Sequence, residues 1–142
     1  MRGSYKPILY DNFMRARTKG FNHGKANCVV IFTHARANLL EQSIQNFLKA
    51  EDKEEWSLVI VQQAGSLEID RVLKDLQSEI DLLVRFFDIG QGVLGNINYS
   101  RLIGTSMAFD LLGAQIVLGV EEDTKISKDA LVFIQKMQKK YG

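Results

Sequence analysis

The chain has 142 residues and a mass of 16.1 kDa, enough for one domain with a substantial core and too few for two. Lysine and arginine total 18 and aspartate and glutamate total 17, so the formal net charge of +1 provides no concentrated positive field for nucleic acid or an anionic membrane. No apolar run approaches the roughly 18 residues of a membrane span, and the single cysteine, Cys28, excludes an internal disulfide and a multi-cysteine metal cage. These counts indicate a soluble, reduced, single-domain chain.

The first 27 residues differ in character from the rest of the chain. They are polar and basic, contain the only proline, Pro7, and show no clear hydrophobic period. We therefore interpret residues 1–27 as a leader and residues 28–142 as the folded domain.

From Cys28 onward, short β-branched apolar runs alternate with amphipathic helical patterns. The first half predicts a strand over 28–33, a helix from Asn38 with Glu41 at capping-box spacing, a strand over 57–61 and a helix capped by Ser66. The second half predicts a strand over about 83–88, a helix from about 98 to 112 ended by Gly113, a strand over 116–120 and a helix capped by Ser127.

The order of these elements is β-α-β-α-β-α-β-α. Strands that alternate with helices predict a Rossmann-like α/β fold, with a mostly parallel sheet flanked by helices. Ligands of such open sheets bind beyond the carboxyl ends of the strands. We therefore expect the functional residues in the four loops at that edge, over 33–37, 62–66, 89–98 and 121–127.

The most distinctive chemical feature is three consecutive acids, Glu121, Glu122 and Asp123, directly after the last buried strand. Carboxylates at a strand end suit a hard cation such as Mg²⁺ or Mn²⁺, whose octahedron a diphosphate would complete. The alternative is that the acids only complement the N-terminal dipole of the following helix. Their position at the ligand-binding edge, together with the mutual repulsion of three adjacent acids, favours the cation site.

The loop after the first strand contains Thr33, His34 and Arg36. A guanidinium there matches a phosphate or the edge of a base, although a solvated arginine paired with a surface acid explains it equally simply. His34 has no second histidine nearby with which to form a metal pair. Cys28 begins a buried strand without a basic partner, which is typical of a core thiol and not of a nucleophile.

The loop over 90–98 is rich in glycine. Gly90, Gly92 and Gly95 fit the letters G-x-G-x-x-G, but they follow the third strand instead of the first, so we interpret the match as coincidence. Arg101 lies in the first turn of the expected helix, where a phosphate could meet free N–H groups. An exposed arginine beside a flexible loop is the alternative.

Four segments together carry a resemblance to a known family: Val29-Val-Ile-Phe-Thr-His-Ala-Arg36; Leu58-Val-Ile-Val-Gln-Gln-Ala-Gly65; Gly95-Asn-Ile-Asn98 with Arg101 and Ala108-Phe109; and Val117-Leu-Gly-Val-Glu-Glu-Asp123. Over about residues 28–135 the chain resembles the nucleotide-sugar half of GT-A glycosyltransferases. It looks most like the group of protein N-acetylglucosaminyltransferase I and O-mannose N-acetylglucosaminyltransferase. The acidic triplet resembles that group's strand-ending Glu-Asp-Asp, its version of the DxD motif.

The resemblance implies a binding site for a UDP-sugar, such as UDP-GlcNAc, whose sugar passes to a hydroxyl of a glycan or glycoprotein acceptor. It implies that Asp123 ligates Mn²⁺, or Mg²⁺, and that Glu121 and Glu122 lie near the ribose or metal-bound water. The other residues that it places around the nucleotide are Thr33, His34, Arg36, Gln63 and Arg101.

The chain departs from the family pattern at three points. Glu122 replaces an aspartate, and Ala64 stands where the family has an aspartate that recognises uracil, with Gln63 as a substitute. The chain ends at Gly142, shortly after the acidic motif, so we expect a truncated domain that lacks the acceptor half and any nameable catalytic base.

Without an anchor or disulfides a cytoplasmic setting is favoured, or the Golgi lumen for a fragment of a eukaryotic-type enzyme. The alternative function is a non-catalytic α/β module that binds a nucleotide, a partner or a second copy, the last two through an open sheet edge.

Overall fold

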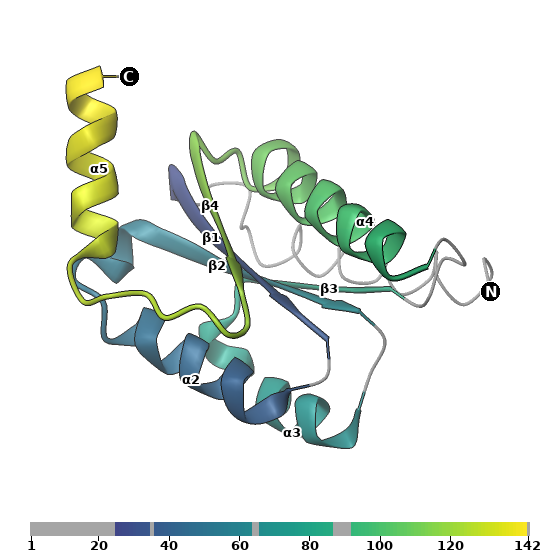
Figure 1. Ribbon diagram of the computed structural model, residues 1–142. Coiled ribbons are helices and arrows are strands. Elements are labelled where there is room, and N and C mark those ends of the chain that lie inside the picture. The colour runs from purple at the N-terminus through teal and green to yellow at the C-terminus, as the bar shows by residue number, and fades with distance from the viewer. Residues whose placement is uncertain (1–24, 35, 64–65, 87–91, 142) are drawn as a thin grey trace.

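A parallel β-sheet organises the computed structural model, which describes residues 25–34, 36–63, 66–86 and 92–141 (Figure 1). The strands are β1 (Asn27–Thr33), β2 (Trp56–Gln63), β3 (Leu82–Phe86) and β4 (Ile116–Glu121). The helices are α2 (Ala37–Leu48), α3 (Leu67–Asp75), α4 (Gly92–Ser106) and α5 (Ala130–Tyr141). Shorter helical segments are η2 (Lys53–Glu55), η3 (Gln77–Glu79) and the π-helical η4 (Met107–Leu111), which continues α4.

The four strands are ordered β3-β2-β1-β4, and every neighbouring pair is parallel. Thr33 lies opposite Gln62 on one side of β1, and Phe32 lies opposite Glu121 on the other side. This register brings the carboxyl ends of three strands together at one edge. The predicted Rossmann-like α/β fold is confirmed.

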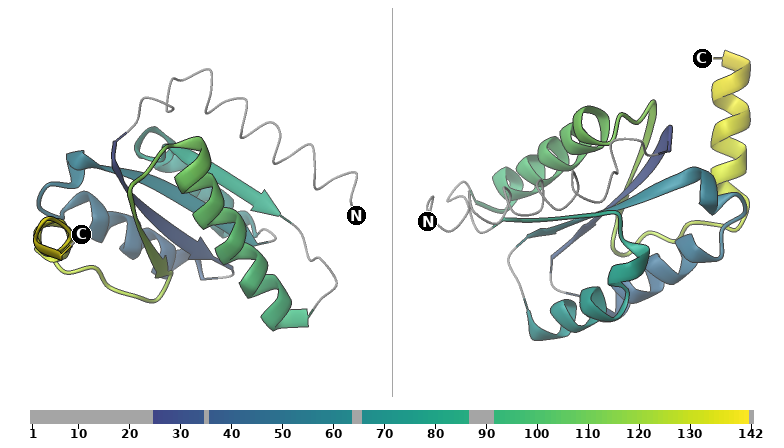
Figure 2. Two further views of the ribbon diagram at one scale, coloured as in Figure 1. Left: turned by 90° about the horizontal axis from the view of Figure 1, so that it is seen from above. Right: turned by 180° about the vertical axis from the view of Figure 1, so that it is seen from behind.

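The helices form a layer on each face of the sheet. Helices α2 and α3 cover one face and α4 crosses the other (Figures 1 and 2). The chain moves from β1 to β2 to β3 in one direction and then returns across the sheet to place β4 beyond β1. Because parallel crossovers are right-handed, reversing the direction of travel moves the connecting helix to the opposite face.

Alternation along the buried strands divides the core between these two layers. Val29 and Ile31 of β1 pack in the cluster that includes α2 and α3, whereas Val30 and Phe32 pack in the cluster beneath α4 and η4. All seven residues of β1 are buried because it has a strand on each side and a helical layer on each face. This is why its sequence is a continuous apolar run and not an alternating one.

Two predicted helix starts are wrong. Helix α2 begins at Ala37 with Arg36 as its N-cap, and no side-chain capping bond forms, so the capping box predicted at Asn38 is absent. Helix α4 begins at Gly92, six residues before the expected start, because the glycines up to Gly95 are part of the helix that packs on the sheet. Tertiary packing here outweighs the weak helix propensity of glycine.

Other predicted helix ends are confirmed in part. The Ser66 hydroxyl accepts a hydrogen bond from the Ile69 N–H at 3.2 Å and caps α3 as expected. Gly113 has a φ of +70° and lies where the helical segment ends, in the left-handed conformation that glycine tolerates best. Ser127, in contrast, lies three residues before α5, and its hydroxyl donates to Asp129 at 3.0 Å.

Helix α5 extends away from the sheet (Figures 1 and 2). Its first turn is anchored by Leu131, which is fully buried, while Phe133 and Met137 are exposed. Within the part of the chain that the structure describes, none of the helices has both the length and the apolar character that crossing a membrane requires.

The Cys28 thiol is expected to be unreactive in the folded protein. Burial, followed by the negative charge of Asp81, raises its pKa from 9.0 to about 12. At pH 8 only about one thiol in ten thousand would then be ionised, and the thiolate is the reactive form. We expect a thiol reagent such as DTNB to label the native chain at pH 8 at least about a hundredfold more slowly than the urea-unfolded chain. Equal rates would contradict this placement of Cys28.

Candidate functional site at the carboxyl edge of the sheet

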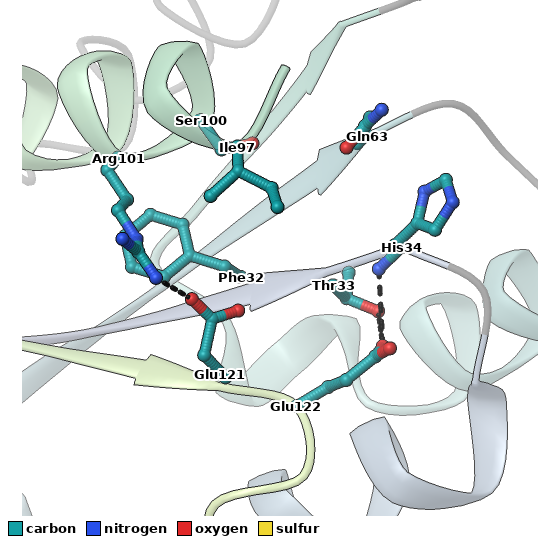
Figure 3. A pocket seen from close by; sticks show the side chains of 9 residues that line it. All are labelled: Phe32, Thr33, His34, Gln63, Ile97, Ser100, Arg101, Glu121 and Glu122. Atoms are coloured by element: carbon teal, nitrogen blue, oxygen red, sulfur yellow. Dashed lines mark hydrogen bonds and ion pairs between the residues drawn. The ribbon is translucent and has the colours of Figure 1, made fainter. Parts of the chain in front are cut away.

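A pocket opens at the carboxyl edge of the sheet, beside the ends of β1, β2 and β4 and against α4. This is the point at which the strand order reverses, and open α/β sheets bind their ligands there. The pocket is lined by Phe32, Thr33, His34, Gln63, Ile97, Ser100, Arg101, Glu121 and Glu122 (Figure 3).

The described walls enclose a cavity of about 60 Å³. A water needs on the order of 10–15 Å³, so the cavity holds a few waters or one small ion, whereas small-molecule sites typically measure about 300–1,000 Å³. Residues 35, 64–65 and 87–91, which follow β1, β2 and β3, lie outside the described residues. The described residues thus form a small, mostly polar pocket.

The first two acids of the triplet contact different parts of the pocket wall. Glu121 points toward Arg101 of α4 and Glu122 points toward Thr33 and His34 at the end of β1, so the two carboxylates have different partners (Figure 3). Three adjacent acids in the sequence therefore do not form one cluster in the structure.

Glu122 is held inside the protein by the loop that follows β1. Only 7% of the residue is exposed, and its Oε2 accepts hydrogen bonds from the Thr33 hydroxyl at 2.6 Å and the His34 backbone N–H at 3.2 Å. The Arg36 Nε lies 3.7 Å from its Oε1. A buried carboxylate is tolerated when it is paired and hydrogen-bonded in this way. Glu122 thereby ties the end of β4 to the end of β1.

The backbone of the same turn is also anchored. The Ser43 hydroxyl of α2 donates to the Glu122 carbonyl at 2.7 Å and approaches the Thr124 carbonyl at 3.4 Å. The Thr124 N–H donates to the Glu121 carbonyl at 3.0 Å and closes the turn. These contacts set the path of the chain on both sides of Asp123.

Glu121 lies on the other face, against α4. Its Oε1 accepts a hydrogen bond from the Arg101 Nη2 at 2.7 Å, and the two side chains are 46% and 57% exposed. The pair lies on one side of the pocket, with Phe32 and Ile97 beside it (Figure 3). One acidic and one basic group therefore face the pocket in direct contact with each other.

The two glutamines at the end of β2 separate by strand alternation. Gln63 lines the pocket, whereas the buried Gln62 donates from its Nε2 to Asp70 at 3.2 Å and accepts from the Arg85 Nε at 2.7 Å. Arg85 also donates from its Nη2 to Asp70 at 3.1 Å. This network joins β2, β3 and α3 and holds Gln63 at the edge of the pocket.

Six of the eight site residues expected from the sequence line this pocket: Thr33, His34, Gln63, Arg101, Glu121 and Glu122. Arg36 lies outside the lining, with 62% of its side chain exposed and its guanidinium beside Glu122. Asp123 is exposed and also lies outside the lining. The structure brings the six together, and their contacts with a ligand stay predictions.

Sequence reasoning missed three lining residues, Phe32, Ile97 and Ser100. Ile97, Ser100 and Arg101 share one face of α4, and Gly104 continues that face at the spacing i, i+3, i+4 and i+7. The predicted helix began at about residue 98 and left out Ile97, so an earlier predicted start would have shown this shared face.

The acidic triplet fits a cation only as part of a larger complex. The described residues contain no group of three His, Cys, Asp or Glu side chains placed to hold a metal. Glu122 is bound to Thr33 and His34, and Glu121 to Arg101, whereas none of the ion pairs among the described residues involves Asp123. Hard cations are often held by one or two carboxylates together with phosphate oxygens and water. The residues therefore fit a cation that a bound diphosphate also coordinates, and do not fit a metal site whose ligands all come from the protein.

Comparison with known proteins finds similarity in structure and not in sequence. No protein-family model matches the chain, and no curated protein matches its sequence. Among solved structures, the chain is similar to residues 1–349 of TarS from S. aureus, with a TM-score of 0.53 and 18% identity over 80% of this chain and 32% of that one. It is also similar to the mannosyltransferase PcManGT from Pyrobaculum calidifontis, in complex with GDP-Man and Mn²⁺, with a TM-score of 0.53 and 15% identity over 92% of this chain and 39% of that one.

These similarities define the class of fold. The chain has a Rossmann-like α/β fold that it shares with part of each of these two structures, with the all-parallel sheet and two helical layers described above. They do not support the narrower group of N-acetylglucosaminyltransferases that the sequence resembles. The chain spans less than two-fifths of the length of either structure.

Proposed function

We propose that the chain is the nucleotide-sugar-binding part of a metal-dependent glycosyltransferase. Residues 28–142 would bind a nucleoside diphosphate sugar at the carboxyl edge of the sheet, and the sugar would pass to a hydroxyl of a glycan or glycoprotein acceptor. A UDP-sugar is the donor that the sequence resemblance implies. A GDP-sugar is the other donor to test, because the mannosyltransferase neighbour is in complex with GDP-Man.

The observation that carries the proposal is the convergence of the sequence-selected residues. Three strands and α4 contribute to the pocket, and they come from parts of the chain that are almost 90 residues apart, as Thr33 and Glu122 show. If the arginine were only solvated, or the acids only complemented a helix dipole, these residues would not be expected to lie together where β4 pairs with β1. The fold shared with part of a mannosyltransferase in complex with GDP-Man supplies an independent reason to expect a nucleotide there.

The pocket residues would contact different parts of the ligand, according to their charge and position. Arg101 would donate to phosphate oxygens, since a guanidinium presents several N–H donors to such acceptors. Gln63 would face the base or ribose from the end of β2. Thr33 and His34 would form the floor, in positions that Glu122 holds through its two hydrogen bonds.

Asp123, aided by Glu121, would hold a Mn²⁺ or Mg²⁺ ion together with the diphosphate. When bound, such an ion neutralises the charge that develops on the leaving diphosphate. Asp123 suits this role because it is exposed and lies in the turn that directly follows β4, which Ser43 anchors. Glu122 would act on the site indirectly, by keeping that turn against the end of β1.

The proposal predicts metal-dependent binding of a nucleoside diphosphate. Calorimetric titration of the full chain with UDP and with GDP is expected to show binding in MnCl₂ that weakens at least about tenfold in EDTA. Replacing Asp123 by alanine is expected to weaken binding in MnCl₂ by a similar factor, because the carboxylate that would hold the ion is lost.

Asp75→Ala is the matched control for this measurement. Asp75 is an exposed acid at the end of α3, at the opposite edge of the sheet, so the variant removes the same charge far from the pocket. Its affinity is expected to stay within about twofold of wild type. Failure of the wild-type chain to bind either nucleotide, with or without Mn²⁺, would refute the proposal and favour a non-catalytic module that binds a partner.

A further inference from the structure

The Arg101–Glu121 ion pair occupies the part of the pocket where the proposed ligand would bind. The two side chains meet at 2.7 Å, and both line the pocket (Figure 3). Arg101 is the cation proposed to receive phosphate, and Glu121 is the acid that faces it. In the structure each partly neutralises the other, so a ligand must compete with this contact for either charge.

This arrangement opposes a ligand of a single charge type. A free diphosphate that approaches Arg101 also approaches the Glu121 carboxylate, and like charges at contact repel. A lone cation that approaches Glu121 meets the Arg101 guanidinium for the same reason. Either ligand alone must break the ion pair and leave one of the two partners unpaired.

A ligand that carries both charges meets no such penalty. Arg101 can transfer its N–H donors from Glu121 to the phosphate oxygens while the Glu121 carboxylate turns to the cation. One ion pair is then exchanged for two complementary contacts, and no charge is left without a partner. The pair is half exposed and bridges α4 to the end of β4, so the exchange requires side-chain rotation only.

We propose that Arg101 and Glu121 together make this pocket selective for the divalent-cation complex of a diphosphate over the free diphosphate. The inference rests on the proposed function and names the species that the site selects. Glu121 is the acid that makes this selection, because it contacts Arg101 directly, whereas the Glu122 carboxylate, which also lines the pocket, is bound to Thr33 and His34. Asp123 is outside the pocket and forms no ion pair with Arg101.

The decisive variant is Glu121→Gln, tested on the full chain by calorimetry with UDP or GDP in EDTA and in MnCl₂. Removing the carboxylate frees Arg101 and removes a repulsive charge, so binding of the metal-free nucleotide is expected to become about fivefold tighter, the upper end for an exposed ion pair. Binding in MnCl₂ is expected to be weaker, because the carboxylate that would contact the cation is lost, so the advantage of the metal complex shrinks. A residue that served only as a metal ligand would show no gain in EDTA.

Asp75→Asn is the matched control, because it removes the same charge at an exposed position far from the pocket without touching Arg101. Its affinity in EDTA is expected to stay within about twofold of wild type. The double variant Arg101→Met with Glu121→Gln completes the test. The gain from Glu121→Gln is expected to disappear when Arg101 is absent, since the gain comes from releasing that guanidinium.

The outcomes separate this inference from the proposed function. Equal gains in EDTA for Glu121→Gln and Asp75→Asn, or a gain that persists without Arg101, would show general charge repulsion and overturn the selective pair while leaving metal-dependent binding intact. Equal affinity of the wild type for the free nucleotide and for its Mn²⁺ complex would also overturn it. Absence of any nucleotide binding by the wild type would overturn both proposals.

Discussion

Replacing Glu122 by alanine is expected to lower the free energy of unfolding by about 3–5 kcal/mol. The substitution removes the acceptor of two hydrogen bonds, from the Thr33 hydroxyl at 2.6 Å and the His34 N–H at 3.2 Å. Hydrogen bonds to a charged group contribute about 1.5–3 kcal/mol each, and the buried Thr33 donor would be left without a partner. Urea unfolding followed by circular dichroism measures the change.

Asp123→Ala provides the contrast for that measurement. Asp123 is the next residue and carries the same charge, but it is exposed, so its removal is expected to change stability by about 0.5 kcal/mol or less. Glu122→Gln is expected to lie between the two, because its amide oxygen can still accept one of the hydrogen bonds. Similar losses for Glu122→Ala and Asp123→Ala would contradict the anchoring role of Glu122.

Replacing Gly104 by alanine is expected to destabilise the fold by about 1 kcal/mol, although alanine favours helices. A Cβ at this position would lie 2.7 Å from the Val61 Cγ2 and 3.0 Å from atoms of Phe32 and Val30. Val61 is buried and β-branched, so its methyl group cannot rotate away freely. Overpacking of this kind costs about 1–3 kcal/mol, and the higher helix propensity of alanine offsets about 1 kcal/mol of that cost. A net loss is therefore expected if α4 and the sheet cannot separate at low cost.

A second variant distinguishes this overpacking from other effects. Val61→Ala removes the methyl group that the new Cβ would meet, and alone it costs stability by leaving a cavity. We expect Gly104→Ala with Val61→Ala to be more stable than the sum of the two single changes predicts, by about 1 kcal/mol or more. Additive losses would show that α4 does not approach β2 as closely as the structure places it.

Gly104 also explains how α4 reaches the pocket. The helix lies close enough to the sheet for Ser100 and Arg101, one turn earlier, to line the pocket above β1 and β4. Displacing α4 is therefore expected to weaken the Arg101–Glu121 contact as well as stability. Because Gly104 has no side chain, α4 can lie close to the sheet, and both the stability of the fold and the position of Arg101 depend on this close packing.

Much of the fold could be predicted from the sequence because the signals were local. The apolar run of β1, the Ser66 cap and the left-handed Gly113 each follow from short-range chemistry, and the structure confirms them. The start of α4 at Gly92 could not be predicted in this way, because packing on the sheet compensates for its glycines. The missing capping bond at Asn38 has a similar cause, since tertiary contacts and not the local motif determine where α2 begins.

The site could be predicted only as a set of loops. The sequence identified Thr33, Gln63, Arg101 and Glu121 as candidates because their loops follow parallel strands. It could not show that Glu122 turns inward while Glu121 turns toward α4, because this depends on which face of the sheet each helix covers. It also could not show that Arg101 and Glu121 form an ion pair, which required the position of α4 over β4.

The sequence by itself determined the order of strands and helices, the edge of the sheet where a ligand would bind and the charged residues available there. Only the tertiary structure decided that β4 lies beside β1 and not beside β3. That choice depends on the return of the chain across the sheet through α4, a long-range event that leaves no local pattern in the sequence. Because of it, the acidic end of β4 meets the Thr33–His34 loop and Arg101, and separate loops become one candidate site.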